Sequence, residues 1–166
     1  MKDRIGSVAA PHVGPDGEFR WPADQDKRDE LASDLLGAEL VGSLDAWLEL
    51  AYEPVRNASP SAEWRRTHST WETDDRFREG FATLTPEQRA LVEDLVSRTA
   101  EGLLFSLLVD LDQFPCGNLD LVVSDSDSGE PLASIMAGSM LDLHDRLGEW
   151  VERFSEYTAQ LRRASP

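Results

Sequence analysis

The chain has 166 residues, of which 40% are apolar and 29% charged, a composition that predicts a folded protein and argues against wholesale disorder. Its 32 acidic residues outnumber its 16 basic ones, so the formal net charge at pH 7 is −16. We expect it to bind neither nucleic acid nor a membrane surface, because the charges that neutralise phosphate groups are scarce. The charge favours a basic protein partner or a cation instead.

A single cysteine, Cys116, excludes an intrachain disulfide and a cluster of thiolate metal ligands. No continuous apolar stretch precedes Pro11, which argues against a signal peptide. No apolar run approaches the length of about 20 residues that a membrane-spanning helix needs. The sequence therefore predicts a cytoplasmic protein.

The first 25 residues contain six glycines and prolines and show little periodicity, so we predict an irregular N-terminal arm over 1–25. Regular structure is expected to begin near 24–26, where acidic side chains suit the first turn of a helix. From Leu31 to Ala51, apolar residues recur mostly at spacings of three and four. This pattern predicts an amphipathic helix.

Two glycines and a proline bear on the continuity of that helix. Gly37 and Gly42 interrupt the pattern, and glycine lowers the stability of a helix interior. A second helix could begin at Ser43. Pro54 is expected to end the segment, because proline cannot donate the next helical hydrogen bond.

Two shorter helices are predicted after this segment. Trp64, His68 and Trp71 are spaced four and three residues apart, which fits a short helix with one aromatic edge. Residues 73–75 suit a helix cap, and two phenylalanines four residues apart follow them.

The densest apolar part of the chain runs from 84 to 123. Thr85 and Gln88 form a capping box around a proline at the first helical position, which marks a helix start. Residues 91–96 continue with a helical stripe. Residues 103–111 are apolar nearly all round, which fits either a fully buried helix or a core strand, and the continuity with the preceding stripe favours the helix.

The last third of the chain predicts one hairpin and one helix. Two short runs with β propensity, 119–123 and 132–136, flank a turn rich in Asp, Ser and Gly. An apolar stripe over 140–162 predicts a C-terminal helix that ends in a basic turn. We therefore predict a helix-dominated α+β fold, with a long central helix, packed N- and C-terminal helices and one small β-hairpin, as a single globular domain over 26–166. An all-α bundle is the alternative.

The sharpest feature of the sequence is its charge distribution. Between Arg98 and Arg146 there are nine acidic residues and no lysine or arginine. Such a run usually forms only a solvated face. It can also attract a basic partner over long range and so act as a docking surface. The residues predicted to bind that partner are Asp110, Asp112, Asp120, Asp125, Asp127, Glu130, Asp142 and Asp145.

A metal site has less support. The alternating carboxylates at 110–112 and 125–129 could supply the oxygen ligands that hard cations prefer. The second segment departs from an EF-hand loop, because its glycine is at the fifth place and Met136 occupies the twelfth. We interpret it as a surface turn, and Asp110 and Asp112 as the end of the buried helix. The histidines lack the spacing of a zinc site. No metal and no cofactor is expected.

Few residues point to catalysis. His144 is bracketed by acidic residues and could transfer protons with a raised pKa, although such a histidine is more often an ordinary helix side chain. A nucleophile elbow and a glycine-rich phosphate loop are both absent from the sequence. The five tryptophans could line a pocket, but core packing is their commoner use.

These observations favour a small acidic interaction protein, without enzymatic activity, that binds a basic protein partner. In size, acidity and lack of a catalytic motif the chain is similar to many small bacterial immunity, antitoxin and inhibitor proteins, which is a similarity of type only. The alternative is a ligand-binding protein or enzyme that uses a Trp-lined pocket, with His68 or His144 as acid or base. A third possibility is a homo-oligomer that buries a leftover leucine face, so both monomer and homodimer remain open.

Overall fold

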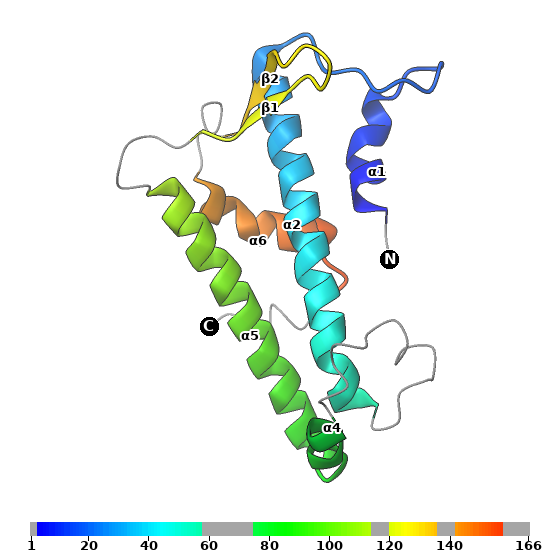
Figure 1. Cartoon of the computed structure of the whole chain (residues 1–166), viewed down its shortest axis with the longest axis vertical. Coiled ribbons are helices and arrows are strands. Elements are labelled where there is room, and N and C mark those ends of the chain that lie inside the picture. The colour runs from blue at the N-terminus through cyan, green and yellow to red at the C-terminus, as the bar shows by residue number, and fades with distance from the viewer. Residues whose placement is uncertain (1–2, 58–74, 114–119, 136–141, 158–166) are drawn as a thin grey trace. The chain divides into compact units, whose positions relative to one another are not determined.

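The computed structural model describes residues 3–57, 75–113, 120–135 and 142–157 (Figure 1). The elements of these residues are, in chain order, the helices α1 (Arg4–Ala9), η1 (a short 3₁₀ helix, Ala10–His12), α2 (Gln25–Arg56), α4 (Asp75–Ala82) and α5 (Pro86–Asp112), the strands β1 (Val122–Ser124) and β2 (Pro131–Ser134), and the helix α6 (Leu143–Phe154). This is the predicted helix-dominated α+β fold with one hairpin. The all-α alternative is wrong, because β1 and β2 pair.

The chain divides into two compact units. Unit 1 consists of Met1–Ser43 with Leu103–Glu156, and unit 2 of Leu44–Gly102 with Tyr157–Pro166. The predicted division into an arm and one globular domain stays a prediction. In the described part of the chain, no helix has both the length and the apolar character needed to cross a bilayer.

In unit 1, the segment predicted to be irregular contains regular structure. Asp3 caps α1, because its carboxylate accepts the N–H of Gly6 at 2.7 Å. Arg4 is buried, and its Nε donates to the carbonyl oxygen of Phe154 at 2.7 Å. The prediction of an irregular arm is therefore wrong for residues 4–12. The Asp3 cap is a local feature, whereas the bond between Arg4 and Phe154 joins residues 150 positions apart and is not visible to local propensity.

The helix α2 begins where the sequence predicts, at Gln25, but it is continuous to Arg56. It runs through both glycines without a second start at Ser43, and Pro54 lies inside its last turn. Gly37 is needed for packing, since a Cβ atom there would lie 2.4 Å from ring atoms of Trp150. Gly37, which weakened the prediction of a continuous helix, thus leaves room for Trp150, the largest fully buried side chain of α6.

The helix α6 is strongly amphipathic, as predicted. Its buried side chains are Leu143, Leu147, Trp150, Val151 and Phe154. It ends at Phe154, earlier than the predicted 162, and 155–157 are not helical. Arg4 Nε donates a hydrogen bond to the carbonyl oxygen of Phe154. In a longer helix this oxygen would accept an N–H from the next turn, so the bond to Arg4 is one reason why the helix ends here.

The hairpin is confirmed within the described residues. β1 and β2 are antiparallel, with Val122 opposite Ser134 and an irregularity after Val123. Gly129 in the connecting turn has a φ of 71°, a left-handed conformation that suits glycine. The hairpin lies beside the first turns of α2 (Figure 1), where the carboxylate of Asp29 accepts the N–H of Ser134 at 2.8 Å.

In unit 2, the capping box at the start of α5 is confirmed. The Thr85 N–H donates to the Gln88 side chain at 2.9 Å, and the Gln88 N–H donates to Thr85 Oγ1 at 3.3 Å. The predicted helix after residues 73–75 is α4. The short helix predicted around Trp64, His68 and Trp71 lies outside the described residues.

Polar contacts join the helices of unit 2. The hydroxyl of Tyr52, which is fully buried, pairs with the Oγ of Ser97. Arg56 makes two parallel hydrogen bonds of 2.8 Å to the Glu93 carboxylate. These bonds connect the last turns of α2 to α5 within this unit.

Residues 103–111 are helical, which confirms the preferred interpretation of that stretch, but they are not fully buried. Leu108 is buried, whereas Leu103, Phe105 and Leu107 are 68%, 45% and 52% exposed. The predicted burial is wrong because a helix that packs through one face leaves the other face in solvent, even when both faces are apolar.

Candidate functional site

Asp112, at the end of α5, binds the start of α6. Its carboxylate accepts the N–H groups of Leu143 and His144, each at 3.0 Å. The residue at the N-cap position of α6, Asp142, makes no capping bond with its side chain. Asp112 therefore caps α6 from another helix, and its negative charge faces the positive end of the helix dipole. Its side chain is only 3% exposed.

His144 is held by the same carboxylate. Its Nδ1 lies 2.7 Å from Oδ2 of Asp112, and its ring meets the ring of Phe105 edge to face at 5.4 Å. The hydrogen bond to Asp112 raises the pKa of His144, and the nearby charges of Asp145 and Asp142 add to this effect. The charged imidazolium is therefore favoured between these carboxylates.

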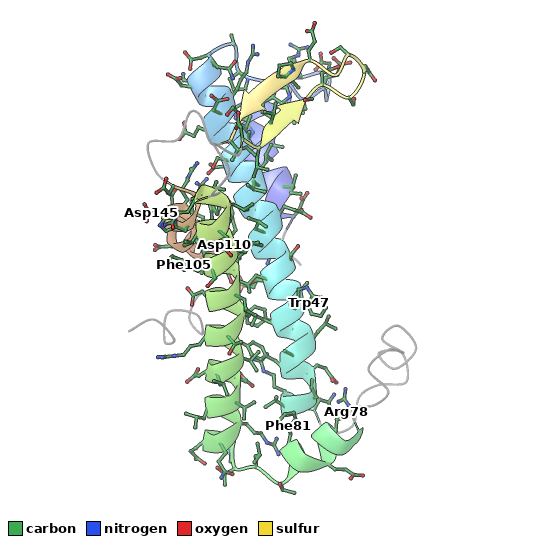
Figure 2. All side chains as sticks on the ribbon, turned by 60° about the vertical axis from the view of Figure 1, so that its left-hand side comes forward. Trp47, Arg78, Phe81, Phe105, Asp110 and Asp145 are labelled. Carbon is green, nitrogen blue, oxygen red and sulfur yellow. The ribbon has the colours of Figure 1, made fainter. Side chains whose placement is uncertain are left out.

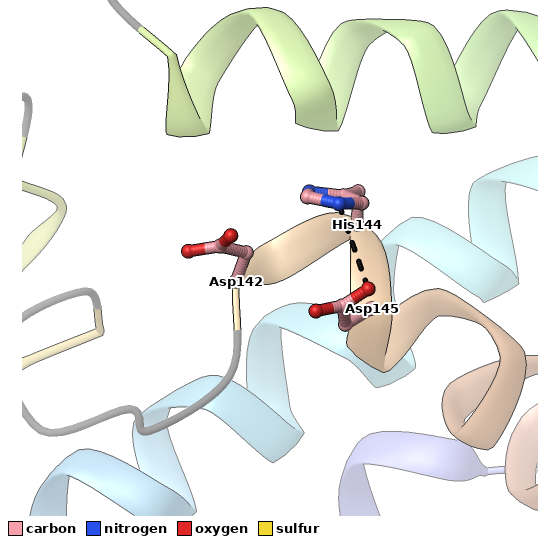
Figure 3. A group of neighbouring side chains, drawn as sticks. All are labelled: Asp142, His144 and Asp145. Carbon is pink, nitrogen blue, oxygen red and sulfur yellow. Dashed lines mark ion pairs between the residues drawn. The ribbon is translucent and has the colours of Figure 1, made fainter.

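The first turn of α6 also brings together possible metal ligands. Ligand atoms of Asp142, His144 and Asp145 lie within 4.8 Å of one another, and His144 Nε2 is 3.5 Å from Asp145 Oδ1 (Figure 3). These groups could hold a divalent cation. Ion pairing explains this arrangement equally well, because a protonated His144 offsets part of the negative charge of Asp112 and Asp145. We therefore interpret the cluster as a charged helix cap.

The eight acidic residues predicted to bind a partner form two groups in unit 1. At the junction of α5 and α6 lie Asp110, Asp112, Asp142 and Asp145. On or beside the hairpin lie Asp120, Asp125, Asp127 and Glu130. The interval between Arg98 and Arg146, which has no lysine or arginine, thus contributes two separate acidic groups to the fold.

The residues of each group differ in what they can offer to a partner. At the junction, Asp110, Asp142 and Asp145 are exposed, whereas Asp112 is committed to its internal bonds. We therefore leave Asp112 out of any docking surface.

On the hairpin, Asp127 and Glu130 are exposed. Asp120 accepts a bond from Ser134 Oγ at 2.6 Å. Asp125 holds the turn together: hydrogen bonds from the backbone and side chain of Ser128, then from the Asp127 N–H, lower the pKa of its carboxyl group.

Exposed apolar side chains accompany the junction acids, and sequence reasoning missed them. Leu103, Leu107 and Asp110 are spaced four and three residues apart, so they share one side of α5. Figure 2 shows Phe105 and Asp110 on α5 and Asp145 on α6. The sequence gives little signal for them, since a run that is apolar nearly all round does not indicate which side of the helix stays exposed. Phe105 lies on the other side of α5, where its ring meets His144 of α6. We define the junction surface as the exposed residues on both sides of this junction, which are Leu103, Phe105, Leu107, Asp110, Asp142 and Asp145.

The proton-transfer role predicted for His144 stays a prediction, and His68 lies outside the described residues. Comparison of the chain with protein-family models, with curated proteins and with solved structures finds no match.

Proposed function

We propose that the protein is a non-enzymatic interaction module, of the immunity, antitoxin or inhibitor type, that binds a basic protein partner through the junction surface. The observation that carries the proposal is that this surface combines apolar side chains that are 45% to 68% exposed with exposed carboxylates. Interfaces commonly combine an apolar centre with a polar, charged rim.

The carboxylates account for the positive charge expected of the partner. Asp110, Asp142 and Asp145 belong to an interval of the chain that contains no lysine or arginine. The net charge of −16 adds a long-range field of the same sign. A partner with a basic surface is attracted over roughly 8 Å, the screening length at physiological salt, and its association slows as salt rises.

The apolar side chains account for the affinity. Leu103 and Leu107 lie one turn apart on α5, and each is more than half exposed. A partner that covers them removes apolar area from water, which is worth roughly 25 cal/mol for each Å². Salt should therefore act mainly on association, and truncation of the leucines mainly on dissociation.

The test begins with affinity purification on the tagged chain and identification of the retained protein by mass spectrometry. Association and dissociation rates of that protein are then measured by biolayer interferometry at 50 and 300 mM NaCl. We expect a basic protein whose association slows on the order of tenfold over this range. The triple variant Asp110→Asn, Asp142→Asn, Asp145→Asn should slow association similarly at low salt, and Leu103→Ser with Leu107→Ser should speed dissociation.

The matched control is Glu18→Gln, Asp26→Asn, Glu39→Gln, which removes three exposed carboxylates of unit 1 that are not part of the junction surface. A second variant, Asp127→Asn with Glu130→Gln, separates the hairpin from the junction. A partner without a basic surface, an affinity independent of salt, or equal effects of the junction and control variants would each contradict the proposal.

A further inference from the structure

Unit 1 contains a cavity of about 400 Å³ that the charged interval does not touch. Residues of α1, η1, α2 and α6 line it, and its apolar part includes Val8, Pro11, Leu31 and Phe154. Leu31 and Phe154 are buried and belong to the core. The volume lies within the range of about 300 to 1,000 Å³ that is typical of small-molecule sites.

Two of the charged side chains that line the cavity are already paired. Asp34 receives two hydrogen bonds from Arg153, at 3.0 and 2.8 Å, and one from Arg146 at 3.2 Å. The guanidinium of Arg153 also lies 4.8 Å from the centre of the Phe154 ring. Arg153 also donates to the Glu149 carboxylate at 3.1 Å, so this network contains two guanidinium groups and two carboxylates and forms a fixed, charge-balanced wall.

The other two charges are Lys27 and Glu30, one turn apart on α2 and both exposed. Among the described residues, neither side chain has an ion pair or a hydrogen bond. Lys27 is one of only two lysines in the chain. The cavity thus presents the ammonium group of Lys27 and the carboxylate of Glu30 beside an apolar lining.

We propose that this cavity binds a small zwitterion with an apolar body, of which a free apolar amino acid is the simplest example. Lys27 binds the carboxylate of the ligand, and Glu30 binds its ammonium group. Side chains three apart on a helix lie about 5 to 6 Å apart at Cβ, so both can reach adjacent groups of one small molecule. The apolar side chain of the ligand covers Leu31 and Phe154. A ligand that carries both charges pairs with Lys27 and with Glu30. An anion or a cation alone pairs with only one of these two side chains.

The test is a titration of the full-length ¹⁵N-labelled protein, followed by amide chemical shifts, with L-leucine and L-phenylalanine up to 20 mM. Two analogues of leucine separate the charges: 4-methylpentanoate lacks the ammonium group, and 3-methylbutylamine lacks the carboxylate. We expect saturable shifts around Val8, Leu31 and Phe154 with the amino acids, and binding at least tenfold weaker with either analogue.

Lys27→Met and Glu30→Gln should each weaken the binding of L-leucine about tenfold, while Glu39→Gln, an exposed position on the same helix, should leave it unchanged. Retention of the wild-type spectrum away from the cavity verifies that each variant folds. The proposal is overturned by the absence of saturable shifts with both amino acids, by shifts that map outside the cavity, or by analogues that bind as tightly as leucine.

Discussion

Asp112→Asn isolates the contribution of one buried carboxylate to stability. The substitution keeps the size of a side chain that is 3% exposed but replaces one of its two acceptor oxygens by a donor. Both oxygens now accept backbone N–H groups, those of Leu143 and His144 at 3.0 Å. One N–H at the start of α6 therefore loses its acceptor, which costs about 2 kcal/mol. For a chain of this length the melting temperature should fall by about 4 to 8 °C.

The effect should also depend on pH through His144. Its pKa is raised in the folded protein, mainly by the bond to Asp112, above its value of about 6.5 in an unfolded chain. A raised folded pKa stabilises the protein fully below about pH 6.5, and this contribution is lost as pH rises through the folded pKa. The difference in stability between wild type and Asp112→Asn should therefore be largest near pH 5.5 and smaller at pH 8.5.

Urea unfolding at these two pH values measures the free energies, and an NMR titration of the His144 ring measures its pKa in both proteins. Asp110→Asn is the matched control, since Asp110 is two residues away on the same helix and exposed. It should change stability by less than about 0.5 kcal/mol. Equal losses for the two substitutions, or a difference that grows as pH rises, would show that Asp112 does not act as the cap described above.

Two further substitutions test packing and buried polar groups. Gly37→Ala should destabilise the protein by about 1 to 3 kcal/mol, because its Cβ would lie 2.4 Å from the Trp150 ring. Gly102→Ala has nothing within 4 Å of its Cβ and should stabilise the protein by up to about 1 kcal/mol. Thermal unfolding compares the two variants, and equal stabilisation by both would contradict the packing of Gly37 against Trp150. Ser97→Ala should lower the free energy of unfolding by about 1 to 3 kcal/mol, because it leaves the buried Tyr52 hydroxyl without its partner. Adding Tyr52→Phe should recover part of that stability, as measured by urea unfolding. Strictly additive effects of the two substitutions would argue against the pair.

The acidic part of the candidate site could be predicted, because charge is a property of composition and of position along the chain. Its apolar part could not be predicted in the same way. Leu103 and Leu108 belong to one apolar run, yet the first is 68% exposed and the second is buried. Which side of a helix is covered depends on the elements that pack against it, and these come from distant parts of the chain.

The sequence by itself determined the features that arise within a few residues. The capping box of Thr85 and Gln88, the start of α2 and the hairpin turn all depend on local hydrogen bonds and backbone preferences. Tertiary structure alone decided that Asp112 is a buried cap while Asp110 faces solvent, although the two are alike in sequence. The partners of Asp112 lie more than 30 residues away, and only the folded chain brings them within hydrogen-bonding distance.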